Sequence, residues 1–271
     1  MVKPNVRPAA DEPCWWFIVV AGEVIVTDAS PRVPFGCQAD LPLPDLLDYI
    51  VLQLGELRER PCYLVMADYG DQQFSGLGEF QSLRVLLFED EALFAMAGRA
   101  SQVAEFLLTH RYCGRCGSRM ETIEWELATQ CSRCSHRCYP RISPCIIVAI
   151  RRGRQLLLAR GKRHKAGLYS ILAGFVETGE SLEQALHREV MEEAGIEVNQ
   201  LQYHFSQPWP FPHSLMMGYT AVWQAGQLRL DPLELEQGDW FDIDELPQTP
   251  PAGTIAHRLI ELSKALITAE N

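Results

Sequence analysis

Short apolar runs rich in β-branched and aromatic residues dominate the first ninety residues of the chain. Residues 15–20 and 24–27 flank a turn that contains Gly22, and this arrangement predicts a β-hairpin. Residues 63–67 and 83–88 predict two further strands. We therefore expect a mixed, β-rich domain at the N-terminal end.

A helix is expected to follow this β-rich part. Asp90 can cap it, and apolar residues recur at helical spacing from Leu93 to Leu107, as far as residue 110. Gly98 lies inside this stretch and could break the helix, because glycine is unfavourable in a helix interior.

From residue 145 onward the hydrophobic pattern is sharper. Residues 146–150 and 155–159 flank an Arg-Arg-Gly-Arg turn and predict a second hairpin. Residues 254–269 have the spacing of an amphipathic closing helix. Further strands are predicted at residues 169–173, 201–206, 214–223 and 227–230.

Between these strands, residues 181–195 predict a helix with well-defined ends. Ser181 can cap it with Gln184 completing a capping box, and Gly195 can end it. Its buried face consists of Leu182, Ala185, Leu186 and Val190.

This helix carries a dense group of charged residues at fixed spacing. The pattern is G-x5-E-x7-R-E-U-x-E-E-x-G-U, in which U is bulky and apolar. Its positions are Gly174, Glu180, Arg188, Glu189, Val190, Glu192, Glu193, Gly195 and Ile196. Glu189, Glu192 and Glu193 stand at i, i+3 and i+4, so they project from one side of the helix and repel one another.

Such a cluster of hard oxygen ligands suits Mg²⁺ or Mn²⁺ together with substrate phosphates. Arg188 can orient a ligand by pairing with Glu192 or by reaching back to Glu180. The alternative is an exposed, glutamate-rich surface helix, which explains three glutamates in one turn but not the full pattern.

Two C-x2-C pairs in the middle of the chain predict a zinc ribbon. Fourteen residues separate the pairs, and the cysteines are Cys113, Cys116, Cys131 and Cys134. Four protein thiolates leave no position for water or substrate, so the zinc is expected to be structural. His136 and Cys138 are alternative ligands at poorer spacing, and residues 122–129 predict a strand. A redox dithiol is the competing interpretation.

Length and composition limit the classes of function. The length of 271 residues suits two domains. The cysteines outside the ribbon are expected to be free thiols. No run of 18 apolar residues exists, so no membrane-spanning helix is expected. The N-terminus lacks the apolar core of a signal peptide, so a cytoplasmic protein without a membrane segment is expected. The net charge of −11 argues against broad electrostatic binding to nucleic acid.

Two segments of this acidic chain contain clusters of basic residues. One lies before the charged pattern of residues 174–196 and consists of Arg151, Arg152, Arg154, Arg160, Lys162, Arg163 and Lys165. It either attracts an anionic ligand or is a solvated hairpin tip. The other lies in the ribbon and consists of Arg115, Arg119, Arg133 and Arg137. It either contacts nucleic acid or serves solubility.

Residues 174–196 match the Nudix box, and the chain resembles the Nudix hydrolases. Ten residues beyond Ile196, the segment Ser206-Gln-Pro-Trp-Pro-Phe-Pro-His-Ser214 resembles the SQPWPFPxS motif of the NADH pyrophosphatase branch, as does the preceding ribbon. Prolines stiffen this segment, so the rings of Trp209 and Phe211 could stack on a base. Alternatively, the rigid loop only fills the core.

The resemblance implies an α+β protein. It would have an N-terminal mixed domain (1–110), a central zinc ribbon (111–140) and a C-terminal Nudix α/β/α sandwich (141–271). It also implies a homodimer that hydrolyses NADH or NAD⁺ to nicotinamide mononucleotide (NMN) and AMP, and that removes the NAD cap from RNA 5′ ends.

The resemblance further implies the site residues. Catalytic metal would contact Glu189, Glu192, Glu193, Glu234 and the Ala173 carbonyl. Phe175 and the partner chain's Tyr139 would clasp the nicotinamide ring. Further substrate contacts would come from Arg84, Glu126, Gln207, Pro208, Trp209, Pro210, Phe211, Pro212, His213, Ser214 and Ala256.

We expect Glu193 to act as the general base, with Glu180 and Arg188 as orienting groups. Two alternatives stay open. One is another Nudix substrate, such as ADP-ribose, a dinucleoside polyphosphate or a nucleoside triphosphate. The other is a zinc-ribbon RNA-binding protein with an inactive Nudix domain.

Overall fold

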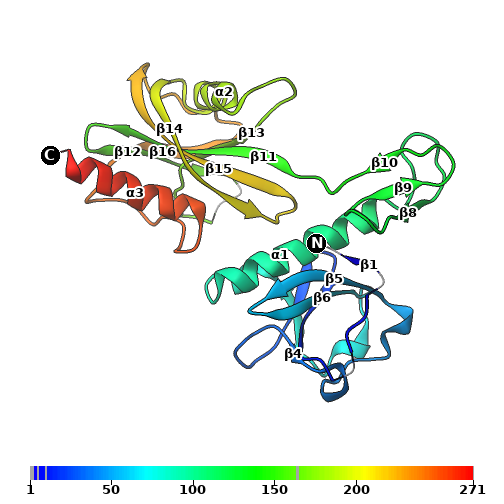
Figure 1. Ribbon diagram of the computed structural model, residues 1–271. Coiled ribbons are helices and arrows are strands. Elements are labelled where there is room, and N and C mark those ends of the chain that lie inside the picture. Colours follow the sequence, from blue (N-terminus) through cyan, green and yellow to red (C-terminus); the bar gives the residue numbers. More distant parts are fainter. Residues whose placement is uncertain (1–2, 5, 10, 163–164, 271) are drawn as a thin grey trace. The chain divides into compact units, whose positions relative to one another are not determined.

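The computed structural model describes residues 3–4, 6–9, 11–162 and 165–270. The predicted basic residue Arg163 lies outside them. The chain divides into two compact units (Figure 1). Unit 1 runs to Arg141 and includes Pro210–His213, and unit 2 contains Ile142–Trp209 and the chain from Ser214 onward. The domain boundaries expected at residues 110 and 140 stay predictions.

A mixed sheet forms the N-terminal part of unit 1, with strand order β1-β5-β6-β2-β3-β7 and β4 paired to β2. Its strands are β1 (Lys3–Pro4), β2 (Cys14–Val20), β3 (Glu23–Val26), β4 (Phe35–Gly36), β5 (Ile50–Leu57), β6 (Arg60–Met66) and β7 (Glu79–Ser82). The predicted hairpin is β2–β3. All seven residues of β2 are buried, and Trp16 and Ile18 pack with Leu46 and Phe74.

Short 3-10 helices lie between or after these strands in the described chain, at Gln38–Asp40, Leu46–Asp48, Gln72–Phe74 and, after β7, Leu83–Leu86. The last of them contradicts the strand predicted for residues 83–88. The Ser82 hydroxyl caps it, and Leu83 and Leu86 are both buried. Apolar residues three apart lie on one face of a 3-10 helix, which explains why the run does not form a strand.

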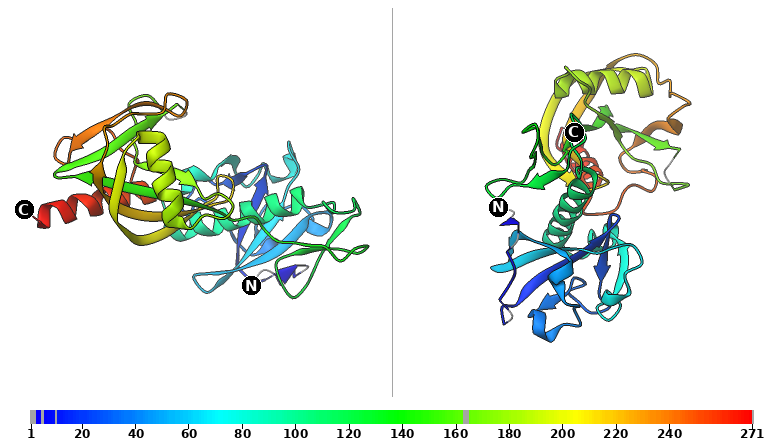
Figure 2. Two further views of the ribbon diagram at one scale, coloured as in Figure 1. Left: turned by 90° about the horizontal axis from the view of Figure 1, so that it is seen from above. Right: turned by 90° about the vertical axis from the view of Figure 1, so that its right-hand side faces the viewer.

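Helix α1 (Glu91–Thr109) packs against this sheet (Figure 2). The Asp90 carboxylate accepts a hydrogen bond from the Leu93 amide at 2.8 Å, so the predicted cap is confirmed. The predicted break at Gly98 is wrong, because the helix is continuous. A Cβ at this position would lie 2.8 Å from the Cγ of Pro210, so glycine permits close packing there.

The ribbon is a three-stranded sheet of β8 (Met120–Thr122), β9 (Thr129–Cys131) and β10 (Arg137–Cys138). The single strand predicted for residues 122–129 is wrong. Thr122 pairs with Thr129, so the residues between them must turn back.

Unit 2 is built on a six-stranded mixed sheet with order β14-β15-β11-β12-β16, and β13 pairs with β11. Its strands are β11 (Ser143–Arg152), β12 (Gln155–Gly161), β13 (Leu172–Phe175), β14 (Glu197–Trp209), β15 (Ser214–Ala225) and β16 (Leu235–Asp242). The predicted hairpin, the strand before the box and the two long strands after it are all present.

One helix covers each face of this sheet, α2 (Leu182–Ala194) and α3 (Ile255–Ala269) (Figure 1). Side chains alternate along β11: Ile146 and Val148 belong to the core cluster under α2, whereas Ile147 belongs to the cluster under α3. The predicted α/β/α sandwich is confirmed.

The edge of this sheet differs from the prediction. Residues 227–230 form no strand; Leu228 and Leu230 instead pack against the α2-side core. Strand β16 was not predicted and pairs with β12. Its sequence, LEQGDWFD, lacks the apolar alternation that marks a half-buried strand.

Among the described residues, no helix is long and apolar enough to cross a membrane. The cytoplasmic location stays a prediction from the N-terminal sequence.

Candidate active site and zinc centre

Helix α2 begins and ends where its sequence predicts. The Ser181 amide donates to the Gln184 side-chain oxygen at 2.8 Å, and the Gln184 amide donates to the Ser181 hydroxyl at 3.2 Å. Gly195 adopts φ +65°, a left-handed conformation that favours glycine. These caps set where the box helix begins and ends.

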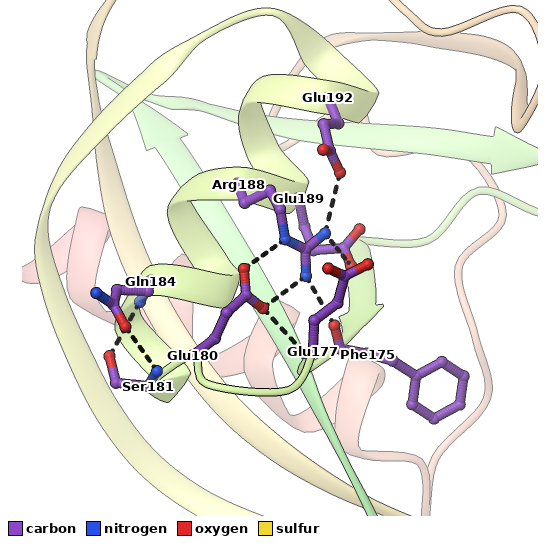
Figure 3. A network of polar contacts seen from close by, with 8 residues as sticks. All are labelled: Phe175, Glu177, Glu180, Ser181, Gln184, Arg188, Glu189 and Glu192. Atoms are coloured by element: carbon purple, nitrogen blue, oxygen red, sulfur yellow. Dashed lines mark hydrogen bonds and ion pairs between the residues drawn. The ribbon is translucent and has the colours of Figure 1, made fainter.

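Arg188 is the centre of the polar network on that side (Figure 3). Its guanidinium donates to both oxygens of Glu180, at 2.6 and 2.9 Å, and to Glu189 and Glu192 at 2.9 and 3.0 Å. The arginine therefore forms both predicted pairings together. It also lowers the pKa of Glu180 to about 2, with help from the Glu177 amide. Glu180 is thus ionised at neutral pH and acts as an orienting group.

The strand before the box approaches α2 very closely. A Cβ at Gly174 would lie 1.9 Å from the Cδ of Glu189, so only glycine leaves room for this carboxylate. The neighbouring Phe175 carbonyl accepts a hydrogen bond from Arg188 at 2.9 Å. The Phe175 ring is about half exposed and points away from the polar network (Figure 3). Ala173 directly precedes this contact in β13.

Glu193 is the most deeply buried acid of the box, with only 7% of its surface exposed. Burial, together with the nearby carboxylates of Glu189, Glu234 and Asp231, raises its pKa to about 8. Glu234 lies outside the box yet interacts directly with Glu193. Buried, crowded carboxylates are a donor set that a hard divalent cation would stabilise, so these residues fit a catalytic metal.

The sequence pattern did not point to Asp231, which lies next to the box in the structure. Its amide donates to the Glu193 carbonyl at 2.9 Å, which holds the 231–234 segment beside the box helix. The sequence feature that could have identified Asp231 is its position three residues before Glu234, which makes it a second acidic residue in the same short segment.

The raised pKa of Glu193 predicts how stability depends on pH when no Mg²⁺ or Mn²⁺ is added. A carboxyl with an unfolded pKa near 4.3 and a folded pKa near 8 binds more protons in the folded state between these values. The unfolding free energy should therefore fall as pH rises from about 4.5 to 8, by roughly 2–4 kcal/mol from this group.

Chemical denaturation across this pH range, for the wild type and Glu193→Gln, measures the effect. The glutamine variant should lose the slope because its side chain does not ionise. Parallel curves for the two proteins would show that Glu193 does not titrate in this window.

Two predicted substrate contacts lie together on the ribbon. The Tyr139 hydroxyl donates to the Glu126 carboxylate at 3.3 Å, and Arg137 donates to the same oxygen at 2.6 Å. The Tyr139 ring is about half exposed.

Two further predicted contacts meet elsewhere in unit 1. The Arg84 guanidinium lies 4.2 Å from the centre of the Phe211 ring, and the centre of the Phe94 ring lies 6.4 Å from the same point. Pro210 packs on Gly98. This part of the proline-rich loop is therefore held by packing as well as by its prolines.

The other residues of the loop differ in exposure. Pro210 and Ser214 are buried, Trp209, Phe211 and His213 are partly exposed, and Pro208 and Pro212 are exposed. Ala256 is buried in the first turn of α3.

Gln207 has a structural task that its motif does not reveal. Its side-chain NH₂ donates to the Gly253 carbonyl, and its side-chain oxygen accepts from the Ile255 amide, both at 2.8 Å. Only 6% of its surface is exposed. Gln207 therefore fastens the start of α3, next to Ala256, to strand β14.

Replacing Gln207 by methionine should lower the unfolding free energy by about 1–3 kcal/mol, because the buried Ile255 amide and the Gly253 carbonyl lose their partner. The exposed Gln202 of the same strand supplies a matched control, and Gln202→Met should change stability by less than about 0.5 kcal/mol. Urea denaturation compares them; equal stability of the two variants would contradict a fastening role.

The four ribbon cysteines converge as predicted. Their sulfurs all lie within 4.8 Å of one another, with 3.6 Å between Cys113 and Cys134 and 3.5 Å between Cys116 and Cys131. A tetrahedral zinc with Zn–S near 2.3 Å requires about 3.8 Å between sulfurs, so the site fits Zn²⁺. Among the described residues, the group that could hold a metal ion consists of Cys113, Cys116, Cys131 and Cys134. The alternative ligands Cys138 and His136 lie outside this group, with 3.5 Å between the Cys138 sulfur and His136 Nε2.

Half of the described basic residues before the box are paired with acids of unit 2. Arg151 pairs with Glu270, Arg154 with Asp242 and Asp244, and Arg160 with Glu236. This favours the interpretation as a solvated hairpin over an anion site.

Comparisons with known proteins agree with both motifs. The NADH pyrophosphatase zinc ribbon domain matches residues 108–139, and the NUDIX domain matches residues 140–262. The protein named NAD-capped RNA hydrolase NudC from Pectobacterium carotovorum is 45% identical over 259 residues, which cover 96% of this chain and 95% of that protein. The chain belongs to the NudC family of Nudix hydrolases.

A NudC relative from Escherichia coli O81 is 45% identical over 256 residues, covering 94% of this chain and 95% of that protein. Among solved structures, a MutT NUDIX hydrolase from Burkholderia pseudomallei is 27% identical and covers 45% of this chain and 97% of that one, with a TM-score of 0.40. Membership of the NudC family confirms the Nudix hydrolase and the zinc ribbon that the two motifs predict.

Proposed function

We propose that this Nudix hydrolase cleaves the pyrophosphate bond of NADH and NAD⁺ to give NMN(H) and AMP, and that it removes the NAD cap from RNA 5′ ends. The observation that carries the proposal is the complete box, with Glu193 and Glu234 side by side, in a chain that aligns along nearly its whole length with relatives named NAD-capped RNA hydrolase.

The proposed catalytic metal is Mg²⁺ or Mn²⁺, held by Glu189, Glu192, Glu193, Glu234 and the Ala173 carbonyl. When bound, such an ion neutralises charge on the phosphates and acidifies water. Arg188 keeps Glu180, Glu189 and Glu192 in fixed orientations. Glu193 accepts the proton of the attacking water, because it is the acid most enclosed by protein.

The proposed enzyme is a homodimer in which Phe175 of one chain and Tyr139 of its partner hold the nicotinamide ring. The exposed rings of both residues support this arrangement, since each would be covered by substrate. Sedimentation equilibrium should give twice the 30.6 kDa mass of the chain. A monomer with full activity would contradict it.

Product analysis tests the proposed reaction. Purified protein with NADH and saturating Mg²⁺ or Mn²⁺ should release NMNH and AMP, separated by chromatography. ADP-ribose and a dinucleoside polyphosphate serve as competing substrates. Preferential cleavage of either would contradict NADH as the main substrate and assign that compound instead. A folded protein that cuts none of them would be a binding protein with an inactive Nudix domain.

A further inference from the structure

The ribbon segment, defined here as residues 111–141, has a charge opposite to that of the rest of the chain. It holds six arginines and three glutamates, which gives +3, whereas the remaining residues carry −14. With Zn²⁺ and four thiolates counted, the segment still carries +1. The acidic balance of the whole chain therefore hides a locally positive module.

Five of the six arginines of this segment have no acidic partner among the described residues. All six are exposed, and Arg137 pairs with Glu126. The other five, Arg111, Arg115, Arg119, Arg133 and Arg141, form no ion pair with any described residue. Of the basic hairpin before the box, Arg151, Arg154 and Arg160 are paired with acids of unit 2. Single exposed arginines without an ion pair to a described residue occur elsewhere, but the ribbon gathers five of them within 31 residues.

Aromatic rings are exposed among these arginines. Tyr112 is 70% exposed and Trp125 is 63% exposed. Tyr112 forms a β-bridge with Arg119, and the Arg137 guanidinium lies 5.8 Å from the centre of the Trp125 ring. Bases of a single strand can stack on such exposed rings.

The zinc site gives this surface a fixed framework. Arg115 and Arg133 occupy the same position in the two C-x-R-C pairs, each directly before a metal-binding cysteine. The sulfurs of the two pairs lie 3.5–3.6 Å apart, so both arginines flank one centre. Long arginine side chains on a fixed base can meet successive phosphates without first ordering a loop.

We infer that the ribbon segment binds the RNA chain that follows the NAD cap, with its arginines on backbone phosphates and its exposed rings on bases. The inference rests on the proposed function, in which capped RNA is a substrate. It assigns to the ribbon a binding role in addition to its structural zinc, and it explains how an acidic protein can hold a polyanion.

The test measures binding of an uncapped, fluorescently labelled single-stranded RNA of about 12 nucleotides by anisotropy. Because this RNA has no cap, the result does not depend on hydrolysis. One variant combines Arg115→Gln, Arg119→Gln and Arg133→Gln. Its control combines Arg60→Gln, Arg99→Gln and Arg229→Gln, which are exposed arginines outside the ribbon without an ion pair to a described residue and give the same charge change.

The ribbon variant should lose about tenfold or more in RNA affinity at low salt. Its slope of log affinity against log salt should fall by about 2, because each phosphate contact with a single strand contributes about 0.7. The control should keep its affinity within about twofold. Both variants should retain zinc and hydrolyse NADH at the wild-type rate, which separates this inference from the reaction itself.

Tyr112→Ala tests the stacking contribution, and it should weaken RNA binding by about fivefold or more without changing the salt slope. Equal losses in the ribbon variant and the control would show that net charge alone matters. Unchanged RNA binding in the zinc-loaded ribbon variant would remove the ribbon from RNA recognition and leave its arginines as solubilising residues.

Discussion

Replacing Glu193 by glutamine is expected to lower turnover of NADH by about a hundredfold or more, the usual scale for a lost general base. Glutamine keeps the shape of the side chain but can neither ionise nor accept the proton of water. Glu193 is buried beside Glu234 and Glu189, so its charge lies where a divalent cation and the pyrophosphate would meet. Steady-state rates with saturating metal measure the loss.

The fold of this variant should remain intact. Burial and like charges raise the pKa of Glu193 to about 8, so its ionised form opposes folding and its removal does not. Glu183→Gln is a suitable control on the same helix, because this glutamate contacts Tyr219 and occupies none of the fixed positions of the box. Turnover of Glu193→Gln at the wild-type level would exclude Glu193 from proton transfer.

Loss of one ribbon cysteine should abolish zinc binding and unfold the ribbon. Cys131 is 1% exposed and lies in β9, and its sulfur is 3.5 Å from that of Cys116. The module has three short strands and a small core formed largely by its own cysteines, so the metal supplies most of its stability. Structural zinc sites contribute on the order of 10 kcal/mol.

The zinc content of Cys131→Ser should therefore be close to zero, compared with about one zinc per chain in the wild type. The variant should also become sensitive to protease within residues 111–141. Its NADH hydrolysis should fall too, because Glu126 and Tyr139 depend on the ribbon for their positions. Cys138→Ser is the matched control, since Cys138 faces His136, and it should keep its zinc. Zinc loss in the control, or retained zinc in Cys131→Ser, would contradict the four-cysteine assignment.

Local sequence determined the elements whose ends are set by their own residues. The box helix begins at Ser181 and ends at Gly195 because both caps lie within the segment itself. The two C-x2-C pairs specified the zinc site for the same reason, since each knuckle is a tight local turn. At residues 83–88 the predicted strand was wrong, because the Ser82 cap and the spacing of Leu83 and Leu86 favour a 3-10 helix.

The sequence by itself determined the chemistry of this protein: a helix bearing glutamates on one side, and four thiolates for zinc. Helical spacing fixes which side chains share a face, whatever surrounds them. Only the tertiary structure decided that Glu234 meets Glu193, that Gln207 fastens the start of α3, and that Arg84 packs on Phe211. These pairs are separated by about forty residues or more, and strand pairing and core packing, not local spacing, bring such segments together.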